Sequence, residues 1–352
     1  MPKLFNAGIF AVARGSRGLS QSDFAELAKW SQGKVSKIEH EMIEPSEADV
    51  EAAAGVTGYP TGLFYEEAVV RGFGTCCMYH RKRTTTPIRL LNQLHDVINI
   101  RRIQIGRIVP GVSLLNEVNF PVMDIDEYES PEQIAQLLRA TWGLPRGPIK
   151  NLSDTVEAAG ALILLMDWGT PKIDAVSQRA SGLPPLFFLD RSKPVDRCRF
   201  TLAHEIGHIV MHRTPSANAE EEADRFAAEF LMPAREIAQD LQRLSIAKAA
   251  ALKLKWRVAM QAIIRRARDV GAINSSAYQS LCVRISQLGY RKNEPNPLKP
   301  ETPKTIRRMI EMYLSDHGYT IAELSAAMHC SEQEFRDVYL RNDDQSQVRL
   351  MR

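Results

Sequence analysis

The sequence has little cysteine, no long hydrophobic run and almost no net charge, and each shortage excludes a class of protein. The five cysteines are odd in number and show no C-x-x-C spacing, which argues against a disulfide framework and a cysteine-type zinc finger. No stretch approaches the roughly 18 apolar residues of a membrane-spanning helix. The N-terminus meets basic residues too early for a secretory signal, so we expect a cytoplasmic protein without a membrane partner.

The formal net charge is +3 for 352 residues, so a surface that binds nucleic acid must be local. One basic run stands out at residues 80–83, and more arginines follow it at 89, 101, 102 and 107. Such a run could lie along phosphates, or it could be the solvated face of a helix.

The most informative stretch is Phe200–His212, which contains the pattern H-E-x-x-H at residues 204–208. On a helix, His204 and His208 lie one turn apart on one face, within reach of a single divalent ion. Glu205 would then stand beside the ion as a base. The pattern also arises by chance in helices where the histidines are surface or core groups. Here the surrounding residues are mostly apolar, so the polar triplet is expected inside, where a metal explains it.

A catalytic zinc needs three protein ligands, so the two histidines need a partner. His212 is too far along, because on a straight helix its Cα would lie about 12 Å from that of His204. We expect it to be a polar residue at the end of the helix.

A better source of the third ligand is a second helix, predicted over residues 220–233. Glu222 lies one turn before Phe226, at the margin of the apolar stripe of this helix, and can point inward. Glu221 is the rival candidate, and Glu220 is expected to be a solvated charge.

Near the N-terminus, residues 19–39 read as two short helices joined by a turn. In the second one, Val35 and Ile38 face inward. In a helix-turn-helix the first helix braces the second, which shows hydrogen-bonding side chains to the major groove. The side chains expected to contact DNA are Gln21, Gln32, Lys34, Ser36 and Lys37. The alternative is a retained helix-turn-helix that only dimerises or docks partners.

The segment GLSQSDFAELAKWSQGKVSKIEHEMIEPSEADVEAAAGVTGYPTGLF resembles the DNA-binding domain of Xre/Cro-type repressors. It has the L-S-Q opening, the V-S-K-I-E recognition helix, the E-P after it and the final L-F of that family. Two features depart from the pattern. Ala28-Lys29-Trp30 stands where the family usually turns with a small residue or glycine, and Gly33 should weaken the recognition helix by roughly 1 kcal/mol relative to alanine. The resemblance implies DNA binding, and a helix-turn-helix commonly binds as a homodimer.

A small sheet is predicted before the histidine-rich helix. Residues 161–166 and 185–189 are apolar runs short enough for buried strands, and residues 168–182 between them fit a turn and an irregular strand. In zinc-peptidase folds an edge strand can hold an extended substrate by main-chain pairing.

The stretch RFTLAHEIGHIVMH, followed by EEEADRFAAEFLMP, resembles the ImmA/IrrE family of zinc metallopeptidases. The family pattern is H-E-x-x-H, then E-A-N-x-F-A with L-M-P, and the likeness extends over residues 124–295. The resemblance implies that His204, His208 and Glu222 bind Zn²⁺ and that Glu205 is the catalytic base. Asp224 replaces the commonest asparagine, a change that should be tolerated.

The expected fold is α+β and mainly helical, with a helix-turn-helix bundle, a zincin-like domain containing a small sheet, and a helical C-terminal region. The predicted segments are the Xre-type helix-turn-helix domain (1–67), a helical connector with the basic run (68–120), the zincin-like metallopeptidase domain (121–245), its helical extension (246–295) and a C-terminal helical segment (296–352). The sequence pattern of the last segment again resembles a helix-turn-helix. We expect this segment to pack against the peptidase domain or to form a surface that binds a partner.

These features predict a DNA-associated zinc metalloendopeptidase that acts as a transcriptional regulator. By the family resemblance, it cleaves a partner repressor and so switches genes of stress response, mobile elements or toxin–antitoxin systems. The alternative is a non-proteolytic Xre-type transcription factor whose metallopeptidase-like domain binds an effector or a partner protein. The intact H-E-x-x-H favours the enzyme, because a purely structural zinc needs no glutamate base.

Overall fold

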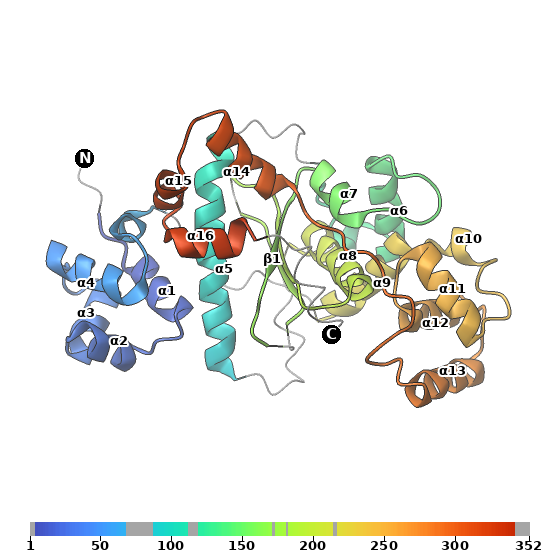
Figure 1. The fold of residues 1–352 in the computed structure, drawn as a ribbon. Helices are drawn as coiled ribbons and strands as arrows, with labels where there is room; N and C mark the ends of the chain where they lie inside the picture. The colour runs from blue at the N-terminus through green and yellow to red at the C-terminus, as the bar shows by residue number, and fades with distance from the viewer. Residues whose placement is uncertain are drawn as a thin grey trace. The chain divides into compact units, whose positions relative to one another are not determined.

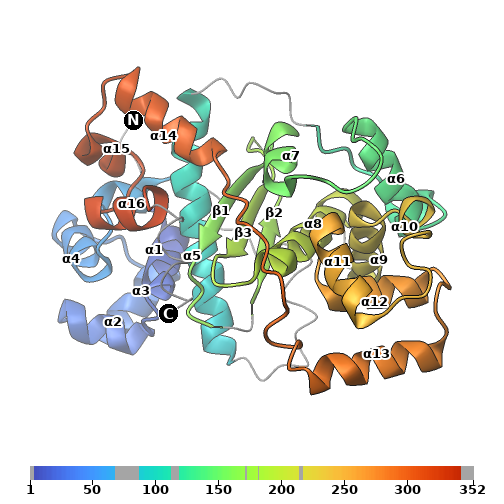
Figure 2. The ribbon, with the colours of Figure 1, turned by 45° about the vertical axis from the view of Figure 1, so that its right-hand side comes forward.

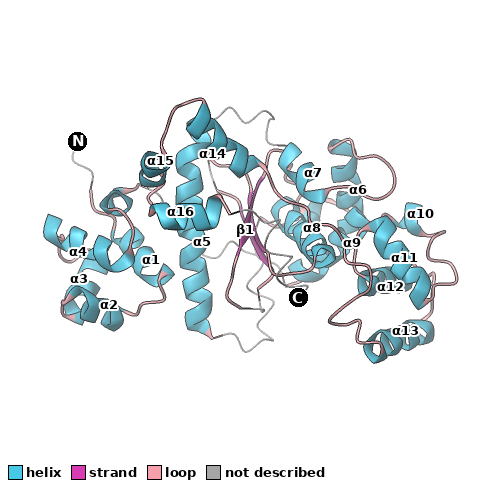
Figure 3. Cartoon of the chain, in the orientation of Figure 1, coloured by secondary structure: helices cyan, strands magenta, loops and turns pink. Residues whose placement is uncertain are grey.

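The computed structural model describes residues 4–67, 87–111, 119–170, 173–180, 182–213 and 217–341. They fall into two compact units, whose elements are labelled in Figure 1. Among the described residues, 4–67, 87–111 and 304–341 belong to the first unit. The described residues between 119 and 303 belong to the second. The fold is mainly helical with one small sheet, as predicted (Figure 3). None of the helices in the described part of the chain combines the length and apolar character of a membrane span.

The first unit begins with a helix-turn-helix bundle. Its elements are α1 (Ala7–Ser16), α2 (Gln21–Ala28), α3 (Gln32–Glu39), α4 (Glu47–Thr57) and the short 3-10 helix η1 (Thr61–Tyr65). Serines cap both helices of the motif, since Ser20 forms a capping box with Asp23 and Ser31 caps α3. Lys29 ends α2 with a φ of 57°, so a lysine takes the left-handed turn conformation that usually favours glycine.

The same unit contains a long helix and the C-terminal helices. They are α5 (Ile88–Ile108), which runs into the 3-10 helix η3 (Val109–Gly111), then α14 (Thr305–Ser315), α15 (Ile321–Ala327) and α16 (Glu332–Tyr339). Glu334 of α16 pairs with Arg101 of α5 at 2.5 Å and with Arg17, just after α1, at 2.8 Å. Tyr339 donates a 2.8 Å hydrogen bond to Gln104 of α5. The C-terminal segment is therefore joined to the helix-turn-helix unit by buried polar contacts.

These contacts change the interpretation of the basic run. Residues 80–83 lie outside the described residues. Arg101 and Arg102 are buried, Arg101 in its pair with Glu334 and Arg102 in a hydrogen bond to Asn99. Arg101 and Arg102 thus stabilise the fold, and neither expected role, along phosphates or on a solvated helix face, applies to them.

The second unit is built on a three-stranded sheet. Its strands are β1 (Leu162–Met166), β2 (Ala175–Gln178) and β3 (Leu186–Asp190), in the order β1-β3-β2 (Figure 2). β1 is parallel to β3 and β2 is antiparallel to it, with Ser177 opposite Phe187. The two predicted apolar strands are confirmed, and the irregular segment between them supplies β2 at one end of this sheet.

The second unit also contains most of the helices of the described chain. They are η4 (Ile125–Glu127), α6 (Pro131–Thr141), α7 (Leu152–Ala158), α8 (Val195–Met211), α9 (Ala219–Leu231), α10 (Ala234–Ile237), α11 (Ile246–Trp256), α12 (Met260–Asp269) and α13 (Ser275–Gln287). Alternate strand residues such as Ala175 and Phe187 share one buried core with Leu202 and Ile206 of α8. This helix therefore lies on one face of the sheet.

Helices α8 and α9 pack closely because a glycine stands between them. A Cβ added at Gly207 would lie 3.0 Å from the ring of Phe226 and 3.4 Å from the Cα of Ala223, both on α9. The glycine in the middle of H-E-x-x-H thus lets α9 approach the histidines.

Residues 293–303 form an extended strap between α13 and α14. Glu294 accepts hydrogen bonds from backbone N–H groups at the start of α12, and Glu301 does the same for α7. Glu301 also pairs with the buried Arg199 of α8. The strap is thereby held to the second unit up to the point where α14 begins.

Candidate metal centre

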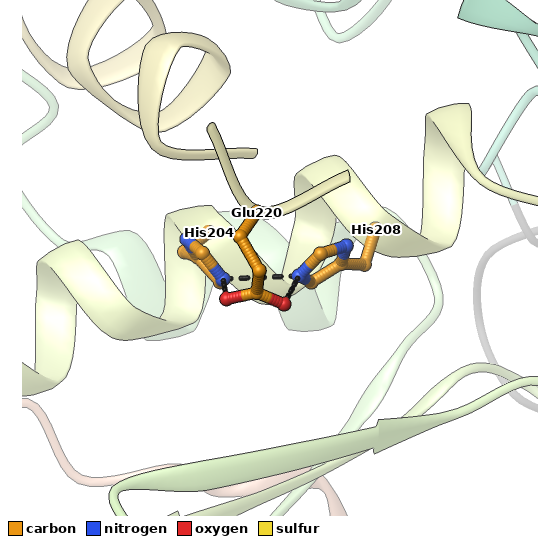
Figure 4. A group of neighbouring side chains, drawn as sticks. All are labelled: His204, His208 and Glu220. Carbon is orange, nitrogen blue, oxygen red and sulfur yellow. Dashed lines mark hydrogen bonds and ion pairs between the residues drawn. The ribbon is translucent and has the colours of Figure 1, made fainter. Parts of the chain in front are cut away.

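Three donor atoms converge between α8 and α9. Nε2 of His204 and Nε2 of His208 are 3.0 Å apart. The carboxylate of Glu220, in the first turn of α9, lies 3.3 Å from His204 Nε2 and 3.2 Å from His208 Nε2. Figure 4 shows the three side chains pointing toward one another.

The glutamate in this group is Glu220, whereas the sequence analysis chose Glu222 and took Glu220 for a solvated charge. The residues of α9 that meet α8 include Ala223 and Phe226. Glu220 lies three residues before Ala223 and so shares its face, whereas Glu222 is rotated by about 200° from Glu220 around the helix. The rival Glu221 is exposed.

The outer nitrogens of both histidines also have partners. Nδ1 of His204 lies 2.9 Å from Oδ1 of Asp224, and Nδ1 of His208 lies 2.9 Å from Nδ1 of His212. His212 in turn contacts Oε2 of Glu222 through Nε2 at 3.0 Å. His212 is thus a buried neighbour of His208, which the distance to His204 alone could not show.

The charges in the group are strongly coupled. Burial opposes a cation, but hydrogen bonds to Asp224 and Glu220 raise the pKa of His204 to about 10. Burial likewise opposes ionisation of Glu220, but hydrogen bonds with His204 and His208 lower the pKa of Glu220 below its ordinary value. His204 and Glu220 therefore favour each other's charged forms.

The residues fit a zinc ion. Two imidazole nitrogens and one carboxylate oxygen are a donor set found in catalytic zinc sites. A tetrahedral ion with bonds of about 2.0–2.1 Å separates its ligand atoms by about 3.3 Å, and the separations here are 3.0, 3.2 and 3.3 Å. Oε1 of Glu220 is buried next to Nε2 of His208, and a cation shared by these two atoms would satisfy the oxygen.

Glu205 lies on the same helix beside the three donors and is buried. The hydroxyl of Ser177 on β2 donates a 2.7 Å hydrogen bond to its Oε2. Ser177 could not be predicted as a partner of Glu205, because the spacing of residues within one helix does not show which strand residue will contact it.

The residues expected to contact DNA lie on or beside α3. Gln32, in its first turn, is exposed and donates a 2.7 Å hydrogen bond to Gln21 at the start of α2. Gln21 donates to Glu39, and Glu39 forms an ion pair with Arg14 of α1. This chain of contacts orients Gln32 on the bundle surface.

The other three expected residues differ in their surroundings. Lys37 is exposed and Ser36 is half-buried. Lys34 forms a 2.5 Å ion pair with Asp49 of α4, and its ammonium group lies 4.5 Å from the ring centre of Trp30. The charge of Lys34 is therefore paired within the helix-turn-helix bundle.

The fold and the site together define a class: a helix-turn-helix domain combined with an α+β domain whose H-E-x-x-H helix meets a glutamate from the next helix. The family comparisons agree with it. Residues 156–268 match the IrrE N-terminal-like domain, a peptidase family, and residues 11–64 match the helix-turn-helix family. No curated protein matches the chain. Residues 156–268 therefore form an IrrE N-terminal-like domain and residues 11–64 a helix-turn-helix domain, which together are the organisation of a DNA-binding regulator.

Proposed function

We propose that this regulator is a zinc-dependent endopeptidase and that its substrate is a partner repressor protein. The observation that supports the proposal most is the convergence of His204, His208 and Glu220, with the buried Glu205 next to them. In this proposal the three converging residues hold the ion and Glu205 is the base.

When bound, zinc lowers the pKa of a water molecule and polarises the carbonyl group of the scissile peptide. Glu205 accepts the proton of that water on its carboxylate as the water attacks the carbonyl carbon. It then donates the proton to the amide nitrogen, which leaves as an amine. The hydrogen bond from Ser177 holds the carboxylate in place during both transfers.

The strand that carries Ser177 also offers a place for the substrate. β2 is the terminal strand of the described three-stranded sheet. An extended peptide can add to such an edge through main-chain hydrogen bonds. A peptide paired with β2 would run past Glu205, because Ser177 joins the two elements.

The helix-turn-helix domain supplies the DNA-binding part of the proposal. Gln32 uses one N–H of its amide for Gln21, which leaves its carbonyl oxygen and the second N–H for a two-point contact with adenine. Lys37 is placed to contact a phosphate. A homodimer would present two such helices to two half-sites.

The test is to incubate the zinc-loaded full-length protein with the repressors encoded near it. We expect one of them to be cut, and a chelator to abolish the cleavage. Glu205→Gln should bind zinc normally and cut nothing. If the zinc-loaded protein cuts none of them but binds a specific DNA site tightly, the non-proteolytic regulator is the correct function.

A further inference from the structure

Arg89 is an exposed arginine in the first turn of α5, and the proposed function gives it no role. Its Nη2 donates a 2.7 Å hydrogen bond to the carbonyl oxygen of Gly18 and a 3.0 Å hydrogen bond to Oδ2 of Asp23. Gly18 lies between α1 and α2, and Asp23 lies in the first turn of α2. A side chain from outside the helix-turn-helix bundle is therefore held at the start of α2.

Further contacts of α5 fix Arg89 at this place. One turn after Arg89, Nε2 of Gln93 donates a 3.4 Å hydrogen bond to the carbonyl oxygen of Ser16. Asp96, about one more turn along, packs so closely on Gly15 of α1 that a Cβ there would collide with its carboxylate. Later residues of α5 share the apolar core of the bundle. The guanidinium is thus carried by a packed helix.

The start of α2 also lies next to the side chain that we propose for base contact. Gln32 of α3 donates a 2.7 Å hydrogen bond to Gln21, which precedes Asp23 by two residues. In a helix-turn-helix bound to DNA, the first helix crosses the sugar–phosphate backbone while the second enters the major groove. A pose that brings Gln32 to a base therefore brings the first turn of α2, and Arg89 with it, to the backbone.

Arg89 keeps the donors that a phosphate needs. A guanidinium is a rigid fork of N–H donors, and both hydrogen bonds of Arg89 use Nη2. Within the described part of the chain, its Nε and Nη1 have no hydrogen-bond partner. The ion pair with Asp23 is exposed, at 69% for the arginine and 48% for the aspartate, so it contributes little to stability. Its main effect is on the surface, where Arg89 cancels a negative charge that would repel DNA.

We propose that Arg89 binds a phosphate of the DNA backbone at the start of α2, and that α5 in this way adds to the DNA-binding surface of the bundle. Gly18 and Asp23 hold the guanidinium through Nη2, which leaves Nη1 to donate to the phosphate. The inference rests on the DNA binding of the proposed function, but not on the metal site or on peptide cleavage. Because a phosphate contact carries no sequence information, Arg89 should strengthen binding to all sequences alike.

The experiment measures how tightly the full-length protein binds a fluorescein-labelled DNA duplex of random sequence at several salt concentrations. Each phosphate that a cationic side chain contacts contributes about 0.9 to the slope of log K against log salt. Arg89→Gln removes the charge but keeps an amide donor for Gly18, and Arg89→Lys keeps the charge. Arg308→Gln on α14 is the matched control, because Arg308 is an exposed arginine of the same unit. Asp23→Asn, alone and combined with Arg89→Gln, separates a phosphate contact from the cancelled charge of Asp23.

We expect Arg89→Gln to reduce the slope by about 0.9, so that its loss of affinity relative to the wild type grows by about three- to fourfold for each roughly fourfold decrease in salt. Arg89→Lys should keep most of the slope, and Arg308→Gln should equal the wild type. The reduction should persist in the Asp23→Asn protein. A wild-type slope in Arg89→Gln, or a reduction that disappears when Asp23 is replaced, would overturn the inference and leave the DNA binding of the proposed function standing. A wild type that binds no duplex even at low salt would refute both.

Discussion

The hydroxyl of Ser177 on β2 lies 2.7 Å from Oε2 of Glu205 on α8, so the terminal strand of the sheet holds the glutamate that we propose as the base. Ser177 is itself buried, and its strand neighbour Phe187 packs in the same core as α8. The orientation of the base therefore depends on how the sheet packs against the helix.

Ser177→Ala should lower kcat of the proposed peptidase by about tenfold, because a hydrogen bond to a charged group contributes about 1.5–3 kcal/mol and part of that orients the carboxylate. Zinc affinity should not change, since Ser177 does not contact the converging donors. Ser177→Thr, which keeps a hydroxyl, is the control. Steady-state cleavage rates and zinc titration measure the two effects, and a rate equal to wild type in Ser177→Ala would contradict the orienting role.

Gly207→Ala tests the close approach of α8 and α9. Alanine improves helix propensity by about 1 kcal/mol, but its methyl group would meet the ring of Phe226 at 3.0 Å and the backbone of Ala223 at 3.4 Å. Overpacking of this kind costs about 1–3 kcal/mol. We expect no gain in stability or a net loss in urea unfolding, together with weaker zinc binding because α9 carries Glu220.

The control for that substitution is Gly33→Ala in α3. No heavy atom lies within 4 Å of the added methyl group. Gly33→Ala should therefore stabilise the protein by up to about 1 kcal/mol. Equal effects of the two substitutions would show that packing against α9 does not matter.

The residues that we propose for DNA contact should show three different effects when substituted. Gln32→Ala should cost about 1–3 kcal/mol on the preferred site and relax specificity there. Lys37→Ala should weaken binding to all sequences and reduce the salt slope by about one. Lys34→Ala should instead lower stability, because Lys34 pairs with Asp49. Binding isotherms at several salt concentrations check all three, and a salt slope that falls in Lys34→Ala as much as in Lys37→Ala would contradict this division.

The packing of α16 against α5 should depend on pH. Burial opposes ionisation of Glu334, but Arg101 and Arg17 lower the pKa of Glu334 below its ordinary value. Tyr59, Cys330 and Tyr339 are further titratable groups nearby. A carboxyl group with a lowered pKa in the folded state stabilises the fold fully above its unfolded pKa of about 4.3. That contribution is lost as the pH falls through the pKa that Glu334 has in the folded protein.

Glu334→Gln should therefore destabilise the protein by about 3 kcal/mol at neutral pH, because it leaves a buried arginine without its charge partner. The loss should shrink below about pH 4, where the wild type is also protonated. Hydrogen exchange of the backbone amides in α14–α16, measured as a function of pH, reports this loss of stability. Glu332→Gln is the control, because Glu332 is exposed on the same helix, and an identical pH profile for both variants would exclude the role of Glu334.

How much the sequence reveals depends on whether the partners lie on one element. His204, Glu205 and His208 share a helix, so their arrangement follows from the helical period alone. Glu220 could also have been found, because it stands at the start of a Glu-x-x-Ala-x-x-Phe-Ala spacing whose small residues face α8. Counting from the wider apolar stripe led to Glu222 instead.

Contacts between distant segments could not be predicted in this way. The partner of Arg101 is 233 residues further along the chain, and that of Glu205 is in a strand recognised only as irregular. A basic run looks the same in sequence whether it meets phosphates or a buried carboxylate. His212 was judged by its distance from His204, although its contact is with His208, one turn away.

The chain order of the two units has a further consequence. Among the described residues, Arg17 and Arg101 precede the second unit in sequence and Glu334 follows it, so the peptidase-family unit is inserted within the unit that carries the helix-turn-helix. A protease that cut once within residues 119–303 would leave two fragments, each carrying a part of the first unit. We expect them to remain associated, as two bands on a denaturing gel but one species in solution, so a nicked regulator would still hold its DNA-binding unit together.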